Sequence, residues 1–349
     1  MDKKILLLFF IIALWFGSVH QAKAQPEVQI TSQTPNYQFG QYIEFQAKIS
    51  SESPPKDIQL ILEAPGLSSF VGEARFTAPD RIQYKYSLTS RPLPAFSTVV
   101  YRYRVTFENG ETYTSQDFSF QYIDNRYTWQ ELEDGDFWVS WYEGDVTFAQ
   151  KIIDVARDGK QDFESLFPNL PEGPPVKIYV YASASELQST LLMTGQTWVA
   201  GHADAELGAI VVSITPGQES TLEIKRQVPH ELAHILLYRI MGEEYQYLPR
   251  WLNEGIASQM EAFPNPDYRL YLEKAHQENR LIPIEELCLR FPSDAADSFL
   301  AYAESDSLIA YLLEYYGAEG IRKLISTYET GVGRSEEHTS ELQSPLCIS

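Results

Sequence analysis

The sequence predicts an α+β protein in which a run of antiparallel strands precedes a mixed α/β region. Three observations support this fold class. Before residue 124, apolar and polar residues alternate with the period of half-buried strands. After it, helical periodicity and short apolar strands take turns. Within this second part, His230, Glu231 and His234 form an HExxH motif, a spacing typical of a metal centre.

The chain begins with the features of a secretory signal peptide. A positively charged start precedes the apolar run Ile5–Phe16, and a small-x-small cleavage pattern ends at Ala24. The apolar run is too short to span a bilayer comfortably, and an uncleaved membrane anchor is the alternative. We therefore expect residues 1–24 to be removed and the protein to be secreted or extracytoplasmic.

Alternating strands fill the next part of the chain. They are Ile43–Ile49, Ile82–Leu88, Val99–Phe107 and Phe118–Tyr122. Asn109-Gly110 follows the third strand and is a strong hairpin signal. Half-buried strands separated by turns predict an immunoglobulin-like β-sandwich over residues 25–124. Its many tyrosines suit a packed sheet surface, and a carbohydrate-binding face is the alternative.

The second part is predicted to alternate strands and helices before the metal motif. The expected elements are a hairpin over Tyr127–Tyr142, a helix over Phe148–Phe167, a strand over Val176–Tyr181, a helix over Ser185–Leu192 and a strand over Leu207–Ile214. The mixture predicts an α/β region with buried strands.

The HExxH segment lies in a predicted helix over Ile224–Met241. Residues four apart share one helical face, so His230 and His234 can point at one metal ion. Glu231 is rotated only slightly from that face and can reach a water on the same ion. Pro229 either opens this helix or bends a helix that begins earlier, and the sequence leaves both open.

A second predicted helix, residues 250–261, carries Glu254. Nineteen residues separate Glu254 from His234, enough chain for a turn and a return. Two imidazoles, one carboxylate and an open fourth position make a catalytic site for one Zn²⁺ ion. The alternative is an ordinary helical pair with two surface histidines.

These residues resemble the gluzincin metallopeptidases, which include thermolysin and the aminopeptidase-N-like enzymes. The segment PRWLNEGIASQ (Pro249–Gln259) is similar to the segment that supplies their glutamate ligand. The closest overall resemblance is to the peptidase-MA-like group. It implies a thermolysin-like mixed α/β metallopeptidase domain over residues 125–333 that acts on peptides or proteins. It also implies that His230, His234 and Glu254 bind zinc and that Glu231 is the general base.

Two further assignments come from the resemblance. AYAESDSLIAYLLEYYG (Ala301–Gly317) resembles the helix that carries the catalytic tyrosine of aminopeptidase-N-like enzymes, and Tyr302 falls on that tyrosine. A core or surface tyrosine is the alternative. In gluzincins the strand before the metal helix lies at the cleft edge, a role that falls on Leu207–Ile214. No GxMEN-type segment occurs, so an endopeptidase is at least as consistent as an exopeptidase.

The remaining histidines of the second part carry weaker expectations. His202 precedes the strand at Leu207 and could line the cleft, although a lone loop histidine is more often solvated. His276 lies among charged residues on a polar helix and is expected at the surface.

Charge and cysteine content exclude several classes of protein. The net charge of −21 argues against nucleic acid and anionic membrane surfaces, which select basic patches. Between residues 25 and 333 the only cysteine is Cys288, so no intramolecular disulfide is expected.

The C-terminal residues have an unusual sequence. RSEEHTSELQS, from Arg334 to Ser344, matches the translation of a common sequencing-library adapter. We expect residues 334–349 to be an artefact, and His338 and Cys347 therefore to have no role. The metallopeptidase domain would then be C-terminally truncated, and a membrane anchor could lie in the missing part.

Two other functions stay open from the sequence. One is a secreted binding or adhesion protein in which the zinc site is not catalytic. The other is a metallohydrolase that acts on a non-peptide bond.

Overall fold

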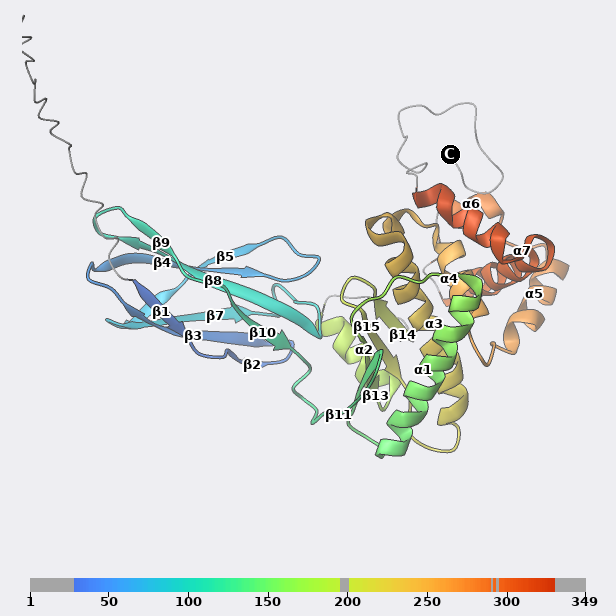
Figure 1. Ribbon diagram of the computed structural model, residues 1–349, viewed down its shortest axis with the longest axis horizontal. Coiled ribbons are helices and arrows are strands. Elements are labelled where there is room, and N and C mark those ends of the chain that lie inside the picture. The colour runs from blue at the N-terminus through green and yellow to red at the C-terminus, as the bar shows by residue number, and fades with distance from the viewer. Residues whose placement is uncertain (1–27, 195–200, 290, 293–294, 330–349) are drawn as a thin grey trace, which may run out of the picture.

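The computed structural model describes residues 28–194, 201–289, 291–292 and 295–329. N-terminal antiparallel β-sheets are followed by a mixed α/β region, which confirms the predicted α+β class at this level (Figure 1). The predicted signal peptide and the predicted artefact at residues 334–349 lie outside the described residues, so both stay predictions. The same holds for the domain boundaries.

Two antiparallel sheets form the N-terminal part. The first has β1 (Gln29–Ser32), β2 (Asn36–Gln38), β3 (Tyr42–Ser50), β6 (Arg75–Ala78) and β7 (Arg81–Ser87). The second has β4 (Pro55–Glu63), β5 (Phe70–Glu73), β8 (Ser97–Phe107), β9 (Thr112–Thr114) and β10 (Phe118–Tyr122). Alternate residues of β3 and β8, such as Phe45 and Tyr101, meet in one core shared by the sheets. All four strands predicted here are confirmed.

A third, mixed sheet lies in the second part. Its strands are β11 (Gln130–Asp134), β12 (Phe137–Trp141), β13 (Val176–Tyr181), β14 (Gly201–Asp204) and β15 (Ala209–Ser213). They are ordered β11-β12-β13-β15-β14. The three central strands are parallel, and both outer strands are antiparallel to their neighbours.

Helices make up the rest of the second part. They are α1 (Val146–Leu166), α2 (Ala184–Met193), α3 (Ser220–Met241), the 3-10 helix η1 (Gly242–Tyr247), α4 (Arg250–Gln259), α5 (Asp267–Gln277), α6 (Ile284–Leu289) and α7 (Ala295–Glu329). The last includes a break at Gly317, whose φ is 65°. The helices predicted at Phe148–Phe167 and Ser185–Leu192 are confirmed as α1 and α2.

The third sheet is buried on both faces. Ile178 and Val180 of β13 point into the larger core, which α1 and α3 cover. Tyr179 and Tyr181 point the other way, into a smaller cluster with α2. Because side chains alternate along a strand, these two sets must face opposite layers. The sheet therefore holds α3 at a fixed place beside β14 and β15.

The edge of this sheet differs from the expected one. The strand predicted at Leu207–Ile214 is β15, which pairs with β13 on one side and β14 on the other. Its backbone groups are used on both sides, so assigning the cleft-edge role to this strand is wrong. The preceding antiparallel strand, β14, is the edge strand of the sheet, and its outer side is unpaired within the sheet.

The N-terminal sheets dock onto the smaller cluster of the third sheet (Figure 1). Phe96, with a positive φ of 61°, stacks on Tyr179 with 3.6 Å between ring centroids. Beside it, the fully buried Asp124 carboxylate accepts hydrogen bonds from Arg126 at 2.6 Å and from Tyr181 at 2.9 Å. A buried carboxylate needs such partners, so the junction is a packed interface.

The expected absence of an intramolecular disulfide concerned residues 25–333, in which Cys288 of α6 is the only cysteine, and it stays a prediction. Over the described ranges, none of the helices combines the length and the apolar character needed to cross a membrane.

A buried glutamate on α7 makes stability depend on pH. Glu304 is 8% exposed and accepts a hydrogen bond from the Ile282 backbone N–H at 2.9 Å. Burial raises the pKa of its carboxyl to about 7, against a smaller lowering by that hydrogen bond. Because this pKa lies above the unfolded value of 4.5, folding stability falls as pH rises from 4.5 to 7.

We predict that Glu304→Gln removes this pH dependence, since glutamine keeps the acceptor and carries no charge. At pH 8 the variant should be more stable than the parent, by roughly 1–2 kcal/mol once partial screening by water is included. At pH 4 the two should be equal. Urea unfolding at both pH values measures this, with Glu314→Gln on the exposed side of α7 as control. An equal difference at both pH values would contradict the prediction.

Candidate metal centre

Helix α3 carries the HExxH motif and begins well before it. Pro229 lies inside this helix, so the alternative in which it opens the helix is wrong. Its ring packs against α1 at Gly159, where an added Cβ would lie 3.1 Å from the Cβ of Pro229. Leu232 and Leu236 are buried on the core side. This packing turns His230 and His234 away from the core, towards α4.

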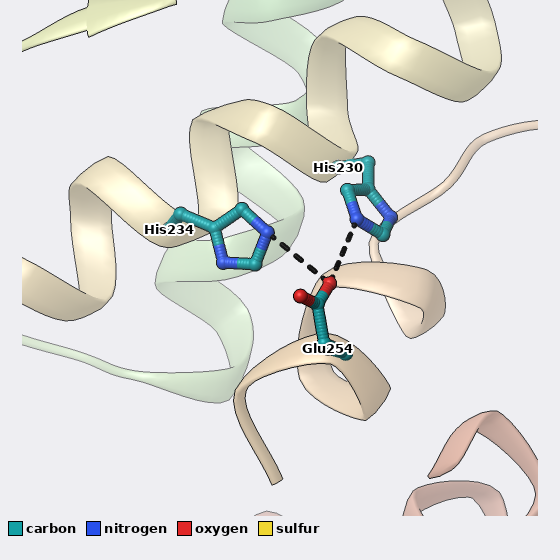
Figure 2. A group of neighbouring side chains, drawn as sticks. All are labelled: His230, His234 and Glu254. Carbon is teal, nitrogen blue, oxygen red and sulfur yellow. Dashed lines mark ion pairs between the residues drawn. The ribbon is translucent and has the colours of Figure 1, made fainter. Parts of the chain in front are cut away.

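Three predicted ligands converge between α3 and α4 (Figure 2). The Nε2 atoms of His230 and His234 lie 3.4 Å and 3.6 Å from Oε2 of Glu254. All three donor atoms lie within 4.8 Å of one another. Each side chain is at most 14% exposed. The structure therefore brings together the ligand set that the sequence predicts.

Each histidine is fixed through its other ring nitrogen. Nδ1 of His230 lies 3.0 Å from Oε1 of Glu261, and Nδ1 of His234 lies 2.8 Å from Oδ1 of Asn253. Both partners are acceptors, so both Nδ1 atoms donate and each Nε2 is left facing the cluster. Asn253 is itself oriented, because its amide donates to the Tyr245 hydroxyl at 2.8 Å.

The donor set fits a zinc ion. Ligand atoms bound tetrahedrally to zinc at about 2.0–2.1 Å lie roughly 3.3–3.4 Å apart. The two nitrogen–oxygen distances given above, 3.4 Å and 3.6 Å, are close to this spacing. Second acceptors on both imidazoles are also typical of metal-binding histidines. The three residues can thus hold one ion with little rearrangement.

Without a cation, the cluster is an ion-pair network. Burial lowers the pKa of His230, but Glu254 and Glu261 outweigh it and raise the pKa to about 10. His234 is raised for the same reason, against burial, chiefly by Glu254. Burial raises the pKa of Glu254, yet both histidines hold it well below its usual range. The cluster is built around positive charge, which a divalent ion supplies.

Glu231 and Tyr302 flank this cluster. Glu231 is buried on α3 at 8% exposure, and its charge contributes to raising the pKa of His230. The ring of Tyr302, on α7, lies 6.5 Å from the ring of His230. Burial raises the pKa of Tyr302 above its usual range and Glu254 adds to this, so its hydroxyl stays protonated. Both predicted catalytic residues therefore lie near the ligands.

Arg250 also lies beside the cluster, which the sequence reasoning missed. Its Nε lies 3.3 Å from Oε1 of Glu254, the carboxylate oxygen that faces away from the histidines. The ring of Phe291 lies 4.7 Å from the guanidinium carbon, and it also packs edge-on against Tyr302. Arg250 therefore holds one Glu254 oxygen and leaves the other to the cluster. The spacing of four residues on a helix is the only signal for it.

A close helix crossing sets the distance between α4 and α7. A Cβ added at Gly255 would lie 2.5 Å from the Ser305 carbonyl oxygen and 2.6 Å from Cγ1 of Ile309. Only glycine permits this approach. Since Gly255 follows Glu254 and Ser305 lies one turn beyond Tyr302, the crossing brings the tyrosine to the ligands.

The other two histidines of the described ranges lie elsewhere. His202 pairs with Val211 across β14 and β15, so its side chain is on the sheet face opposite α3. It lines a small cavity with Phe96 and Leu191 at the junction with the N-terminal sheets. The expectation that it could line the metal cleft is therefore wrong. His276, on α5, is exposed as predicted.

A mixed α/β region with two helix-borne histidines and a glutamate on a neighbouring helix defines an HExxH…E metal-site domain. Residues 170–341 match the family model described as Peptidase MA superfamily. The chain thus carries a Peptidase MA superfamily domain, and its His230/His234/Glu254 cluster is consistent with the zinc site of that group.

Comparisons with whole proteins add little. No curated protein matches this chain. A family 56 carbohydrate-binding module is similar at 13% identity and a TM-score of 0.20, over 26% of this chain and 98% of that one. The polysaccharide deacetylase BC0361 of Bacillus cereus is similar at 7% identity and a TM-score of 0.21, over 55% of this chain and 60% of that one. At such scores neither likeness supports a functional argument.

We predict that Gly255→Ala disturbs the site through the α4–α7 crossing. The added methyl group overlaps backbone and must push α7 away, at a cost of about 1–3 kcal/mol of unfolding free energy. The melting temperature from thermal unfolding measures the change. Gly173→Ala is a matched control, because the atoms nearest its new Cβ are the flexible end of Arg239. Equal melting temperatures for the two variants would contradict the prediction.

Proposed function

We propose that the protein is a secreted zinc-dependent peptidase that hydrolyses peptide bonds. The observation that carries this is the convergence of two imidazoles and one carboxylate, each imidazole fixed at Nδ1, beside the buried Glu231. Membership of the Peptidase MA superfamily supports it, since a peptidase domain implies protein substrates. The net charge of −21 supports a protein without nucleic-acid or anionic-membrane partners.

In this proposal the second part is a thermolysin-like gluzincin domain, residues 125–333, and the first part an immunoglobulin-like sandwich, residues 25–124. The outer side of β14 is then the platform for extended substrate. Its neighbour β15 is fully paired, whereas an edge strand has free N–H and C=O groups that can pair with a peptide backbone.

When bound, zinc would supply Lewis acidity that polarises a carbonyl and acidifies water towards a pKa of ~7. His230, His234 and Glu254 would hold it. Glu231 then takes a proton from the attacking water and delivers it to the leaving amine, as base and then acid. Its low exposure keeps this carboxylate away from bulk solvent.

Tyr302 is suited to stabilise the developing oxyanion. Its hydroxyl is protonated at neutral pH, because burial raises its pKa, so it can donate a hydrogen bond. It comes from α7, whereas Glu231 lies on α3. A donor of this kind typically contributes ~3 kcal/mol to transition-state stabilisation.

Two other functions compete with a peptidase. A binding or adhesion protein could use the ion only to brace α3 against α4. The buried Glu231 argues against a purely structural ion, because a structural site does not need an additional buried carboxylate beside its ligands. A hydrolase for a non-peptide bond would use the same groups, and only its substrate would differ.

We predict that Glu231→Gln keeps zinc and loses turnover. Glutamine has the same size and lacks a basic oxygen, so hydrolysis should fall by at least about 10²-fold. Casein cleavage by the parent, its loss with a chelator and its return with zinc measure the activity. Metal analysis of the variant is the control. Near-normal cleavage by the variant would remove Glu231 as the base, and no cleavage by the parent would favour the other two functions.

We predict that Tyr302→Phe lowers kcat by about 10²–10³-fold with zinc content unchanged, because one oxyanion donor is lost. Steady-state kinetics on a fluorogenic peptide gives kcat and KM. Tyr311→Phe, on the exposed side of the same helix, is the matched control and should behave as the parent. An unchanged kcat for Tyr302→Phe would leave it as a packing residue only.

A further inference from the structure

Pro229 leaves one carbonyl of α3 without its helical partner. In a regular α-helix the N–H of residue 229 would donate to the carbonyl of Lys225, four residues earlier. Proline has no N–H, and its ring pushes that carbonyl outward. The bond is therefore missing inside an otherwise continuous helix, one residue before His230.

The freed carbonyl is used by the segment that follows α4. The Ala262 N–H donates to the Lys225 oxygen at 2.9 Å. Next to this bond, the guanidinium of Arg226 lies over the ring of Phe263 at 5.4 Å. Two consecutive residues after α4 are thus docked on the turn of α3 that the proline opens.

The residue before Ala262 holds a predicted metal ligand. Glu261 is only 5% exposed in its side chain, and its Oε1 lies 3.0 Å from Nδ1 of His230. This residue lies beyond the end of α4, which stops at Gln259. Its backbone N–H donates to the Ser258 carbonyl at 3.2 Å, which ties it to α4 but not to α3, so its position against α3 needs a further constraint. The backbone bond from Ala262 to Lys225 supplies that constraint.

We propose that Pro229 is a positioning residue for the metal site: by freeing the Lys225 carbonyl it anchors Ala262, and thereby holds Glu261 against His230. Asn253, the partner of His234, lies within α4 and needs no such anchor. The role in zinc binding rests on the proposed function, whereas the anchor itself does not.

The test uses the full chain and two readouts that need no peptidase activity. Pro229→Ala restores an N–H that draws the Lys225 carbonyl back into the helix. Hydrogen exchange at the Ala262 amide should then quicken about tenfold or more. Zinc affinity, measured by competition with a chelator, should fall about 10–100-fold, as for other lost partners of ligand histidines.

A mutant cycle separates this route from a general loss of packing. Glu261→Ala should weaken zinc binding by a similar factor, and adding Pro229→Ala to it should cost nothing more. Val228→Ala, also buried on α3, removes packing but leaves the Lys225 carbonyl engaged with Ala262, so neither readout should move. Ala262→Pro removes the N–H donor without changing α3. It should weaken zinc binding by the same factor as Pro229→Ala, and it replaces Pro229→Ala in the test if Pro229→Ala folds poorly.

The outcomes distinguish the two proposals. Unchanged exchange at Ala262 in Pro229→Ala, or additive losses of affinity in the double variant, would overturn the positioning role. A parent protein that takes up no zinc would overturn the proposed function instead. In that case two measurements on Pro229→Ala would still test whether Pro229 anchors Ala262. One is hydrogen exchange at the Ala262 amide. The other is the NMR signal of the His230 ring, which should shift as Glu261 moves.

Discussion

The whole site depends on two helices lying close enough for one carboxylate oxygen to face two imidazole nitrogens. Buried like this, Glu254 is stable only beside positive charge, and the two histidines or a divalent ion can supply it. The distances of 3.4 Å and 3.6 Å leave no room for a side chain between the three groups. The neighbouring side chains limit how far these three groups can move.

Several neighbours contribute to that limit, each by different physics. Asn253 and Glu261 fix the imidazole rings by hydrogen bonds, and Arg250 holds the outer oxygen of Glu254. Gly255 acts sterically, because its missing side chain lets α7 approach and carry Tyr302 to the cluster. The third sheet packs against α3 through one face, and Phe96 from the N-terminal part covers part of the opposite face, so the sheet gives α3 a rigid base.

Much of this arrangement follows from local sequence patterns. Strand alternation predicts four of the ten described N-terminal strands, and helical periodicity predicts α1, α3 and α4, because one face of each of these elements is buried. The two histidines also follow, since HExxH spacing places them on one helical face. Glu254 follows from the similarity of Pro249–Gln259 to the segment that supplies the glutamate ligand in gluzincins. The edge strand was misassigned because strand order depends on long-range pairing: β14 is only four residues long and has no clear pattern of its own.

The groups around the ligands were hardest to predict. Glu261 lies beyond α4, and the tertiary contact between Ala262 and Lys225, which no periodicity encodes, helps to place it against His230. The sequence allowed two readings of Pro229, because local rules permit a proline both at the start of a helix and within one. His202 was misplaced for a related reason, since the face of a strand on which it lies depends on register.

The central claim, one zinc ion held by two imidazoles and a carboxylate with a position left open, is tested most directly by X-ray absorption at the zinc edge. The purified parent protein should contain one zinc per chain, in a shell of two imidazole nitrogens and oxygen atoms at about 2.0–2.2 Å, without sulfur. Replacing Glu254 with alanine should alter that shell. Protein without stoichiometric zinc, or a shell with fewer than two imidazoles, would contradict the claim.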